Sequence, residues 1–213
     1  HVFHLSTAKE TNLFSNKIAL KDKRITAEVC IHHLWFDDSD YQNKGNFIKW
    51  NPAIKSENDK KELLKALLDN RIDVIATDHA PHTLDEKNQV YAKAPSGGPL
   101  VQHALPALLE MVHQQKITIE KLVEKSCHNP AILFQINKRG FIKEGYFADL
   151  VLINMNNPWN VTKENILYKC GWSPFEGVTF QSKITHTFVN GNLVYQNGNF
   201  ISNIKGKRLE FNR

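Results

Sequence analysis

Short apolar segments alternate with helix-like segments through the first 115 residues, and this rhythm constrains the fold more than any other feature of the chain. Strand-like runs lie at residues 1–6, 24–31 and 72–77, and helical patterns lie at 7–21, 56–70 and 100–113. Alternation of this kind predicts parallel strands joined by helices, because a parallel neighbour needs a crossover connection. We therefore expect an α/β fold in this part.

Two of the helical patterns make specific predictions. In residues 56–70, Ser56 and Asp59 form the S-x-x-D pattern of a capping box at a helix start. The buried stripe of this helix is expected to comprise Leu63, Leu64, Leu67 and Leu68. In residues 7–21, apolar side chains recur at roughly helical spacing and predict a further helix.

The later part of the chain changes to short strands separated by tight turns. After helical patterns near "IEKLVEKSC" and "NPAILF" come "ADLVLIN", "KITHTFVNG" and "NLVYQNGNF". The dipeptides Asn190-Gly191 and Asn197-Gly198 favour type I′ hairpins, whose two central residues both need positive φ. We place the domain boundary near residues 139–145, with domains of 1–139 and 140–213.

Composition narrows the class of protein. The 213 residues are 41% hydrophobic and 23% charged, which is typical of a globular protein with a buried core. The net charge of +5 is spread along the chain without an aromatic-basic or recognition-helix pattern, so we expect no nucleic-acid partner. No apolar run has the length of a membrane span, and we expect no membrane association.

The three cysteines, Cys30, Cys127 and Cys170, are far apart in the sequence and include no C-x-x-C pair. This spacing indicates neither a disulfide framework nor a thiolate zinc site. It fits a reducing compartment, and we expect a cytoplasmic protein.

Polar residues with the chemistry of a metal site follow the strand at 72–77. Asp78 lies at its end, where parallel α/β folds place their sites, and His79 and His82 come directly after it. His4 lies at the end of another strand of the same predicted sheet. Carboxylate oxygen and imidazole nitrogen are ligands that catalytic zinc accepts. A lone Asp in this position is more often a helix cap or a loop acid, but the neighbouring histidines favour a site.

Five segments, taken in order, resemble the C-terminal portion of the dihydroorotases of the amidohydrolase superfamily. They are "HVFHLSTAKE", "KWNPAIK", "ATDHAPHT", "APSGGP" and "RGFIKEGYFADLVLI". The resemblance covers essentially the whole chain, and "ATDHAPH" is its most diagnostic element. It implies a metal-dependent TIM barrel with a β-sandwich, of which residues 1–139 would supply barrel strands 6–8 and residues 140–213 a small β domain with hairpins.

The resemblance also implies a reaction and roles for single residues. The family interconverts carbamoyl-aspartate and dihydroorotate in pyrimidine biosynthesis, with one or two Zn²⁺ ions. His4 matches a metal ligand, and Asp78 matches a metal ligand that also carries the proton during catalysis. Substrate-binding positions of the family match Asn51, His82 and the loop from Pro95 to Gly97. His79 is expected to orient its metal-binding neighbour. His32 and His33 resemble a paired histidine segment, for which we expect a loop or supporting role rather than ligation.

The family's other metal ligands, among them a His-x-His pair and a bridging lysine or aspartate, belong upstream of His1. A complete barrel typically needs about 250 residues, so this chain is expected to be an incomplete fragment that is inactive alone. We expect its partners to be the small-molecule substrate, a companion N-terminal segment or a second copy in a homodimer.

Two other functions stay open. Allantoinases and dihydropyrimidinases share the metal site and the cyclic amide chemistry, although "NPAIK" and "APSGGP" favour a dihydroorotase. A non-catalytic homologue that serves as a structural partner, for instance of aspartate transcarbamoylase, belongs to a different class. Against this alternative, a homologue without catalytic activity is not expected to keep His4, Asn51, Asp78 and His82 together.

Overall fold

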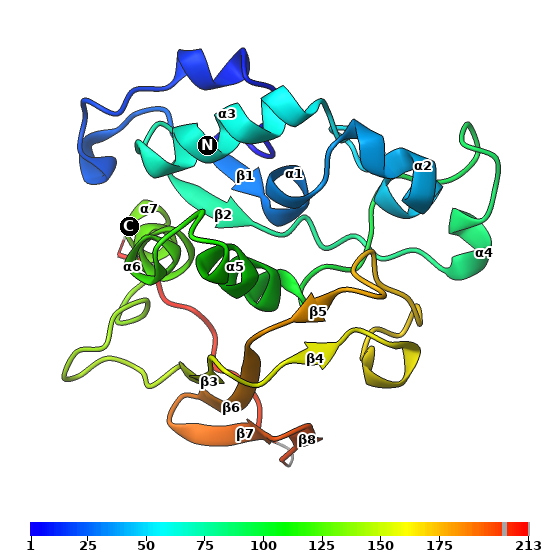
Figure 1. The fold of residues 1–213 in the computed structure, drawn as a ribbon. Coiled ribbons are helices and arrows are strands. Elements are labelled where there is room, and N and C mark those ends of the chain that lie inside the picture. The colour runs from blue at the N-terminus through cyan, green and yellow to red at the C-terminus, as the bar shows by residue number, and fades with distance from the viewer. Residues whose placement is uncertain (202–203, 213) are drawn as a thin grey trace. The chain divides into compact units, whose positions relative to one another are not determined.

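Two parallel strands, β1 (Glu28–Cys30) and β2 (Val74–Ala76), lie side by side in the first part of the computed structural model, which describes residues 1–201 and 204–212 (Figure 1). Val29 is the register partner of Ile75. The segment before β1 joins the same parallel arrangement through a bridge between Val2 and Ala27. The prediction of parallel β/α units in this region is confirmed.

The helix α3 (Glu57–Leu68) lies on the crossover between β1 and β2. Its predicted capping box is present, because the Asp59 N–H donates to Ser56 Oγ at 3.2 Å and the Ser56 N–H donates to Asp59 Oδ2 at 3.3 Å. Leu63 and Leu67 are buried as predicted, but Leu68 is 39% exposed. The buried stripe is therefore narrower than the leucine pattern indicated.

The predicted helix at residues 7–21 is wrong. This segment contains only two short 3₁₀ turns, η1 (Glu10–Leu13) and η2 (Leu20–Asp22). Leu13 is 79% exposed and Ile18 is 48% exposed, so the apolar residues do not form a buried face. Helices in proteins gain most of their stability from such a face, and without it the periodicity alone does not produce a helix.

The remaining helical elements are short. They are α1 (Ile31–Trp35), η3 (Asp38–Asp40), α2 (Tyr41–Lys44), η4 (Gly45–Ile48), α4 (Leu84–Lys87), α5 (Ala104–His113), α6 (Ile119–Val123), a π-helical turn η5 (Glu124–His128), α7 (Asn129–Leu133) and η6 (Lys163–Asn165). The helix predicted at 100–113 thus begins at Ala104. Within residues 1–201 and 204–212, no helix combines the length and apolar character that crossing a membrane requires.

The later strands form an antiparallel sheet in the order β3-β6-β7-β8. Its members are β3 (Leu150–Asn154), β6 (Lys183–Val189), β7 (Asn192–Gln196) and β8 (Asn199–Phe200). Both Asn-Gly dipeptides have positive φ at each residue, as predicted for type I′ hairpins. A separate pair joins β4 (Trp159–Asn160) to β5 (Thr179–Phe180). The β-sandwich stays a prediction.

The chain divides into two compact units. Residues 1–108 and 160–179 make the first unit, and residues 109–159 and 180–213 make the second. Every residue predicted to belong to the functional site lies in the first unit. The division into domains of 1–139 and 140–213 stays a prediction.

Candidate metal and substrate site

His4 and Asp78, the two predicted metal ligands, lie next to each other. Nε2 of His4 is 3.6 Å from Oδ1 of Asp78, and both side chains are about one quarter exposed. Both residues adopt positive φ, 56° for His4 and 46° for Asp78. This backbone conformation is uncommon for residues other than glycine and is concentrated at functional sites. The ends of two strand segments on either side of β1 therefore bring the predicted ligands together.

Glu28 on β1 holds the opposite edge of the His4 ring. Its Oε1 lies 2.7 Å from His4 Nδ1, and its Oε2 lies 3.0 Å from Nε2 of His1. A carboxylate accepts, so Nδ1 of His4 donates to Glu28, and Nε2 is the ring nitrogen that faces Asp78. Burial raises the pKa of Glu28, and the neighbouring His4 acts in the opposite direction. Sequence reasoning missed this residue, although an acid within the apolar run "AEVCI" was a signal.

The distance between His4 and Asp78 suits a shared zinc ion. Metal–ligand bonds near 2.0–2.1 Å in a tetrahedron place neighbouring ligand atoms about 3.3 Å apart, close to the 3.6 Å observed. Metal-binding histidines usually donate their second N–H to a carboxylate, which is the arrangement of His4 with Glu28. These residues fit a metal ion with respect to donor type and geometry.

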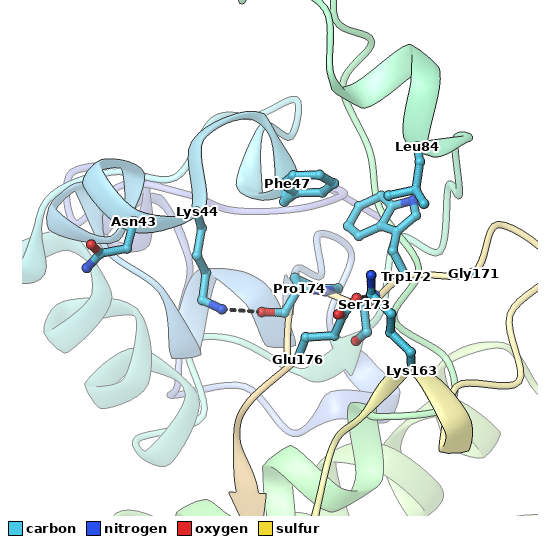
Figure 2. Close-up of a pocket in the computed structure, with 10 residues that line it drawn as sticks. All are labelled: Asn43, Lys44, Phe47, Leu84, Lys163, Gly171, Trp172, Ser173, Pro174 and Glu176. Atoms are coloured by element: carbon cyan, nitrogen blue, oxygen red, sulfur yellow. Dashed lines mark hydrogen bonds between the residues drawn. The ribbon is translucent and has the colours of Figure 1, made fainter.

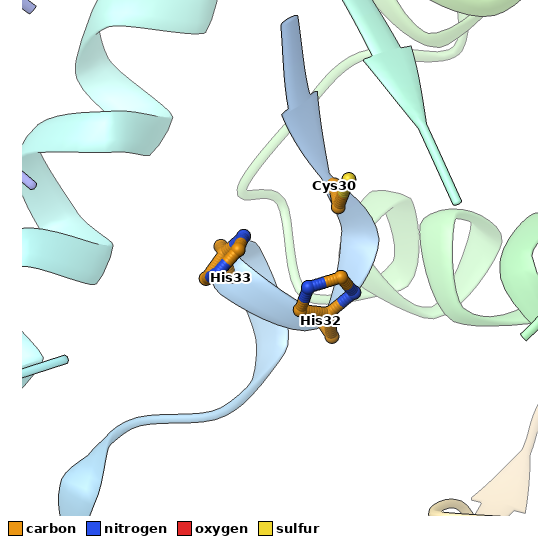
Figure 3. Close-up of side chains that lie close together, drawn as sticks. All are labelled: Cys30, His32 and His33. Carbon is orange, nitrogen blue, oxygen red and sulfur yellow. The ribbon is translucent and has the colours of Figure 1, made fainter. Parts of the chain in front are cut away.

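A second group of donors is packed beside them on β1 and α1 (Figure 3). Donor atoms of Cys30, His32 and His33 lie within 4.8 Å of one another, and all three residues are buried. Burial raises the pKa of the Cys30 thiol and lowers the pKa of His33 to about 4. The His32 ring stacks on Trp50 with centroids 4.3 Å apart. His32 and His33 lie in the short buried helix α1, so the expectation of a loop here is wrong. Their supporting role stays a prediction.

His79 is tied to the backbone of a neighbouring segment. Its Nδ1 accepts hydrogen bonds from the N–H groups of Leu100, at 3.0 Å, and Val101, at 3.3 Å. A neutral imidazole that accepts at Nδ1 carries its proton on Nε2. Neither nitrogen then offers a free lone pair, so this tautomer suits a residue that supports Asp78 rather than a metal ligand.

The predicted substrate-binding segments also meet. The Gly97 N–H donates to Lys49 O at 2.9 Å, two residues before the exposed Asn51, and His82 Nε2 donates to Ser96 O at 3.1 Å. Gly97 has φ of +119°, and a Cβ there would lie 2.6 Å from the Ala80 carbonyl oxygen. Only glycine allows this close approach. The loop from Pro95 to Gly97 is therefore held against the segments that carry Asn51 and His82.

A cavity of about 400 Å³ opens beside His79 and His82. It is lined by His79, Pro81, His82, Thr83, Glu86, Tyr168, Lys169 and Cys170. A second cavity of about 280 Å³ lies elsewhere in the first unit, where Lys44 Nζ donates to Pro174 O at 2.7 Å (Figure 2). Its lining includes none of the predicted site residues, so the first cavity is the one connected with the candidate site.

Comparisons with known proteins identify the family of this chain. A match to the amidohydrolase family covers residues 1–194. The chain is 34% identical over 209 residues to the dihydroorotase of Pyrococcus furiosus, covering 98% of this chain and 48% of that protein. It is 40% identical over 199 residues to the dihydroorotase of Carboxydothermus hydrogenoformans, covering 92% of this chain and 46% of that protein.

Solved structures show the same fold. The L-hydantoinase (dihydropyrimidinase) of Arthrobacter aurescens superposes with a TM-score of 0.86 at 25% identity, over 94% of this chain and 46% of that structure. The dihydropyrimidinase of Brevibacillus agri gives a TM-score of 0.81 at 21% identity, over 94% of this chain and 45% of that structure. The chain spans about half the length of the curated relatives it matches.

Proposed function

Because this chain belongs to the amidohydrolase family, we propose that the complete protein is a zinc-dependent dihydroorotase, which reversibly cyclises N-carbamoyl-L-aspartate to L-dihydroorotate in pyrimidine biosynthesis. The observation that carries the proposal is the identity of 34–40% to dihydroorotases over more than nine tenths of the chain. The juxtaposition of His4 with Asp78 supports it.

In this proposal His4 and Asp78 hold zinc, with one or two ions in the complete site and further ligands from residues upstream of this chain. Zinc, when bound, lowers the pKa of a coordinated water to about 7 and makes hydroxide available at neutral pH. Glu28 keeps the His4 ring oriented through the 2.7 Å contact at Nδ1. His79 fixes the loop after Asp78 through its two backbone hydrogen bonds.

Asp78 is the proposed catalytic residue. In the hydrolytic direction its carboxylate takes a proton from the attacking water and then delivers it to the ring nitrogen that leaves. In the direction of ring closure it takes the proton from that nitrogen. The positive φ of Asp78 directs its carboxylate toward His4 and the site, instead of continuing along the strand.

Asn51, His82, Pro95 and Gly97 make up the proposed substrate side. An amide side chain, an imidazole and the second lone pairs of backbone C=O groups can pair with the ring amide and the carboxylate of dihydroorotate. Sites of this kind discriminate strongly, because an analogue that lacks a partner leaves a polar group of the site unpaired.

The complete protein is proposed to close its barrel with residues that this chain does not supply. We expect the companion segment to be joined in the same protein or contributed by a partner, and we propose a homodimer in the cytoplasm. An association of the complete protein with aspartate transcarbamoylase is a further proposal about its partners. The chain alone is expected to be inactive, and dihydroorotase turnover by the purified 213-residue chain would contradict this.

A dihydropyrimidinase-like activity on other cyclic amides is the second candidate function. The similarity to an L-hydantoinase structure, with a TM-score of 0.86, favours it. The test is to measure turnover of dihydroorotate, a dihydropyrimidine, a hydantoin and allantoin by the complete protein. We expect dihydroorotate to give the highest kcat/KM, and activity to be lost with a chelator and restored by Zn²⁺. Preference for a neutral ring would instead establish the second candidate, and no turnover with any substrate would indicate a non-catalytic homologue.

A further inference from the structure

Lys87, the last residue of α4, is a buried lysine outside the proposed catalytic machinery. Only 1% of it is exposed. Its Nζ donates to three backbone carbonyl oxygens, those of Lys49 at 3.3 Å, Pro95 at 2.9 Å and Gly97 at 2.8 Å. An ammonium group has three N–H donors, and each of them has a partner here.

The three carbonyls belong to the two segments that carry proposed substrate contacts. Pro95 and Gly97 are themselves such positions, and Lys49 lies two residues before Asn51. The segments also contact each other directly, because the Gly97 N–H donates to the Lys49 carbonyl at 2.9 Å. Lys87 therefore sits where the two segments converge and fixes their separation.

Lys87 also reaches the third proposed substrate position through Trp172. Its Nζ lies 5.8 Å from the centre of the Trp172 ring, and this tryptophan is only 1% exposed. Trp172 Nε1 donates to the His82 carbonyl oxygen at 2.7 Å. The ammonium group of Lys87 is thus connected, directly or through one residue, with all three segments.

Maintaining a cation in this place is costly. Burial lowers the pKa of Lys87 to about 8, and the charge of Lys49 acts in the same direction. An apolar side chain of the same length would avoid this desolvation, but it would leave the carbonyl oxygens of Pro95 and Gly97 without their donor and the Lys49 carbonyl with the Gly97 N–H alone. The arrangement therefore requires a side chain with three N–H donors. A side chain that only fills space would not need them.

We propose that Lys87 is a positioning residue for substrate binding, which holds the segments bearing Asn51, His82 and the Pro95–Gly97 loop in one arrangement without touching the substrate itself. The inference rests on the proposed function as far as the ligand is concerned. Loss of the ammonium group should loosen substrate contacts while leaving His4 and Asp78 in place.

The experiment compares Lys87→Met with Lys23→Met in the complete protein. Lys23 is a matched control, because it is also a buried lysine, with a side chain 4% exposed, but it pairs with Asp73 ahead of β2. For Lys87→Met we expect KM for dihydroorotate to rise at least tenfold, kcat to change less than threefold and bound zinc to be unchanged. For Lys23→Met we expect lower stability with KM within twofold of the parent value. Lys87→Gln, which keeps a shorter donor, serves if Lys87→Met does not fold, and should give an intermediate KM.

Hydrogen exchange tests the role of Lys87 without a measurement of enzyme activity. The Gly97 amide, which donates to Lys49 O, should exchange at least tenfold faster in Lys87→Met or Lys87→Gln and at the parent rate in Lys23→Met. Unchanged exchange at Gly97, unchanged KM in the Lys87 variants, or an equal rise of KM in Lys23→Met would overturn the proposal. Absence of dihydroorotate turnover in the parent protein would reject the proposed function, and the exchange rates would then decide on Lys87 alone.

Discussion

His4 and Asp78 both adopt positive φ, and their side chains meet with Nε2 and Oδ1 3.6 Å apart. The two residues end strand segments that lie on either side of β1, although they are far apart in the sequence. A positive φ is uncommon for residues other than glycine, although His and Asp adopt it more often than most. Their coincidence at one edge of the sheet is what makes this edge the candidate site, and it leads to the first prediction.

Asp78→Asn in the complete protein should lower kcat by about 10²–10⁴, which is the usual contribution of a positioned proton-transfer group. The amide keeps the size of the side chain but cannot take up the proton. Steady-state kinetics and metal analysis check this together. Asp85→Asn, at an exposed position of α4, is the control and should leave kcat unchanged. Normal turnover of Asp78→Asn would remove Asp78 from the mechanism.

Glu28→Gln should weaken zinc binding by about 10–100-fold, because residues that orient metal-binding histidines typically contribute this much. Glu28 is buried and contacts both His4 and His1. Zinc affinity measured by competition with a chelator gives the comparison. Glu57→Gln removes an exposed ion pair with Lys61 and should bind zinc as the parent does. Equal affinities for Glu28→Gln and the parent would separate Glu28 from the metal site.

His79→Leu should destabilise the protein by about 2 kcal/mol, because the N–H groups of Leu100 and Val101 lose their shared acceptor. Asn places its Oδ1 near the position of Nδ1, so His79→Asn should recover most of this loss. Urea unfolding of the two variants provides the measurement. Equal stability of the leucine and asparagine variants would show that the acceptor is not what matters.

Gly97→Ala should be strongly destabilising and should impair substrate binding. The new Cβ would lie 2.6 Å from the Ala80 carbonyl oxygen, a contact that requires the backbone to shift. Gly145→Ala is a matched control, since Gly145 also has positive φ but has no heavy atom within 4 Å of the added Cβ. Its cost should stay near the 1 kcal/mol typical of a strained backbone conformation. Unfolding midpoints of the two variants should differ clearly, and similar values would contradict the close approach.

Asp37 contributes to a folding stability that decreases at acid pH. Its hydrogen bonds with Lys60, first, and with Ser39 lower the pKa of the carboxyl to about 2. A folded-state pKa below the unfolded value of 3.8 means that the contribution is present above pH 3.8 and is lost as the pH falls toward 2. The Asp37 carboxyl thus adds about 2 kcal/mol to the free energy of unfolding above this pH range. Asp37→Asn should therefore be less stable at pH 6, and its stability should fall less between pH 4 and pH 2, as followed by urea unfolding. A parallel pH dependence in both proteins would rule this out.

Local patterns predicted much of the fold. The capping box of Ser56 and Asp59, the Asn-Gly hairpins and the apolar strand at 72–77 depend on residues close together in the sequence. The helix predicted at 7–21 failed because its apolar residues needed a buried face, and Leu13 remains 79% exposed. Periodicity describes a potential face, but only tertiary packing determines whether that face is buried.

The same difference between local sequence patterns and tertiary contacts applies to the candidate site. His4, Asp78 and His82 stand out because histidines and acids at strand ends suggest a site. Glu28 and Lys87 act on residues far away in the sequence, and their partners are ring edges or backbone carbonyls. An isolated sequence does not contain these pairings, so neither role could be predicted from it.

The parallel pairing around β1 has a consequence for folding fidelity. β1 lies between the segment that carries His4 and the strand that leads to Asp78, with Val2 opposite Ala27 and Val29 opposite Ile75. A slip of one residue in either pairing would turn the affected side chains to the other face. His4 and Asp78 would then no longer meet, so the proposed zinc binding would distinguish chains with correctly aligned strands from compact but misaligned ones.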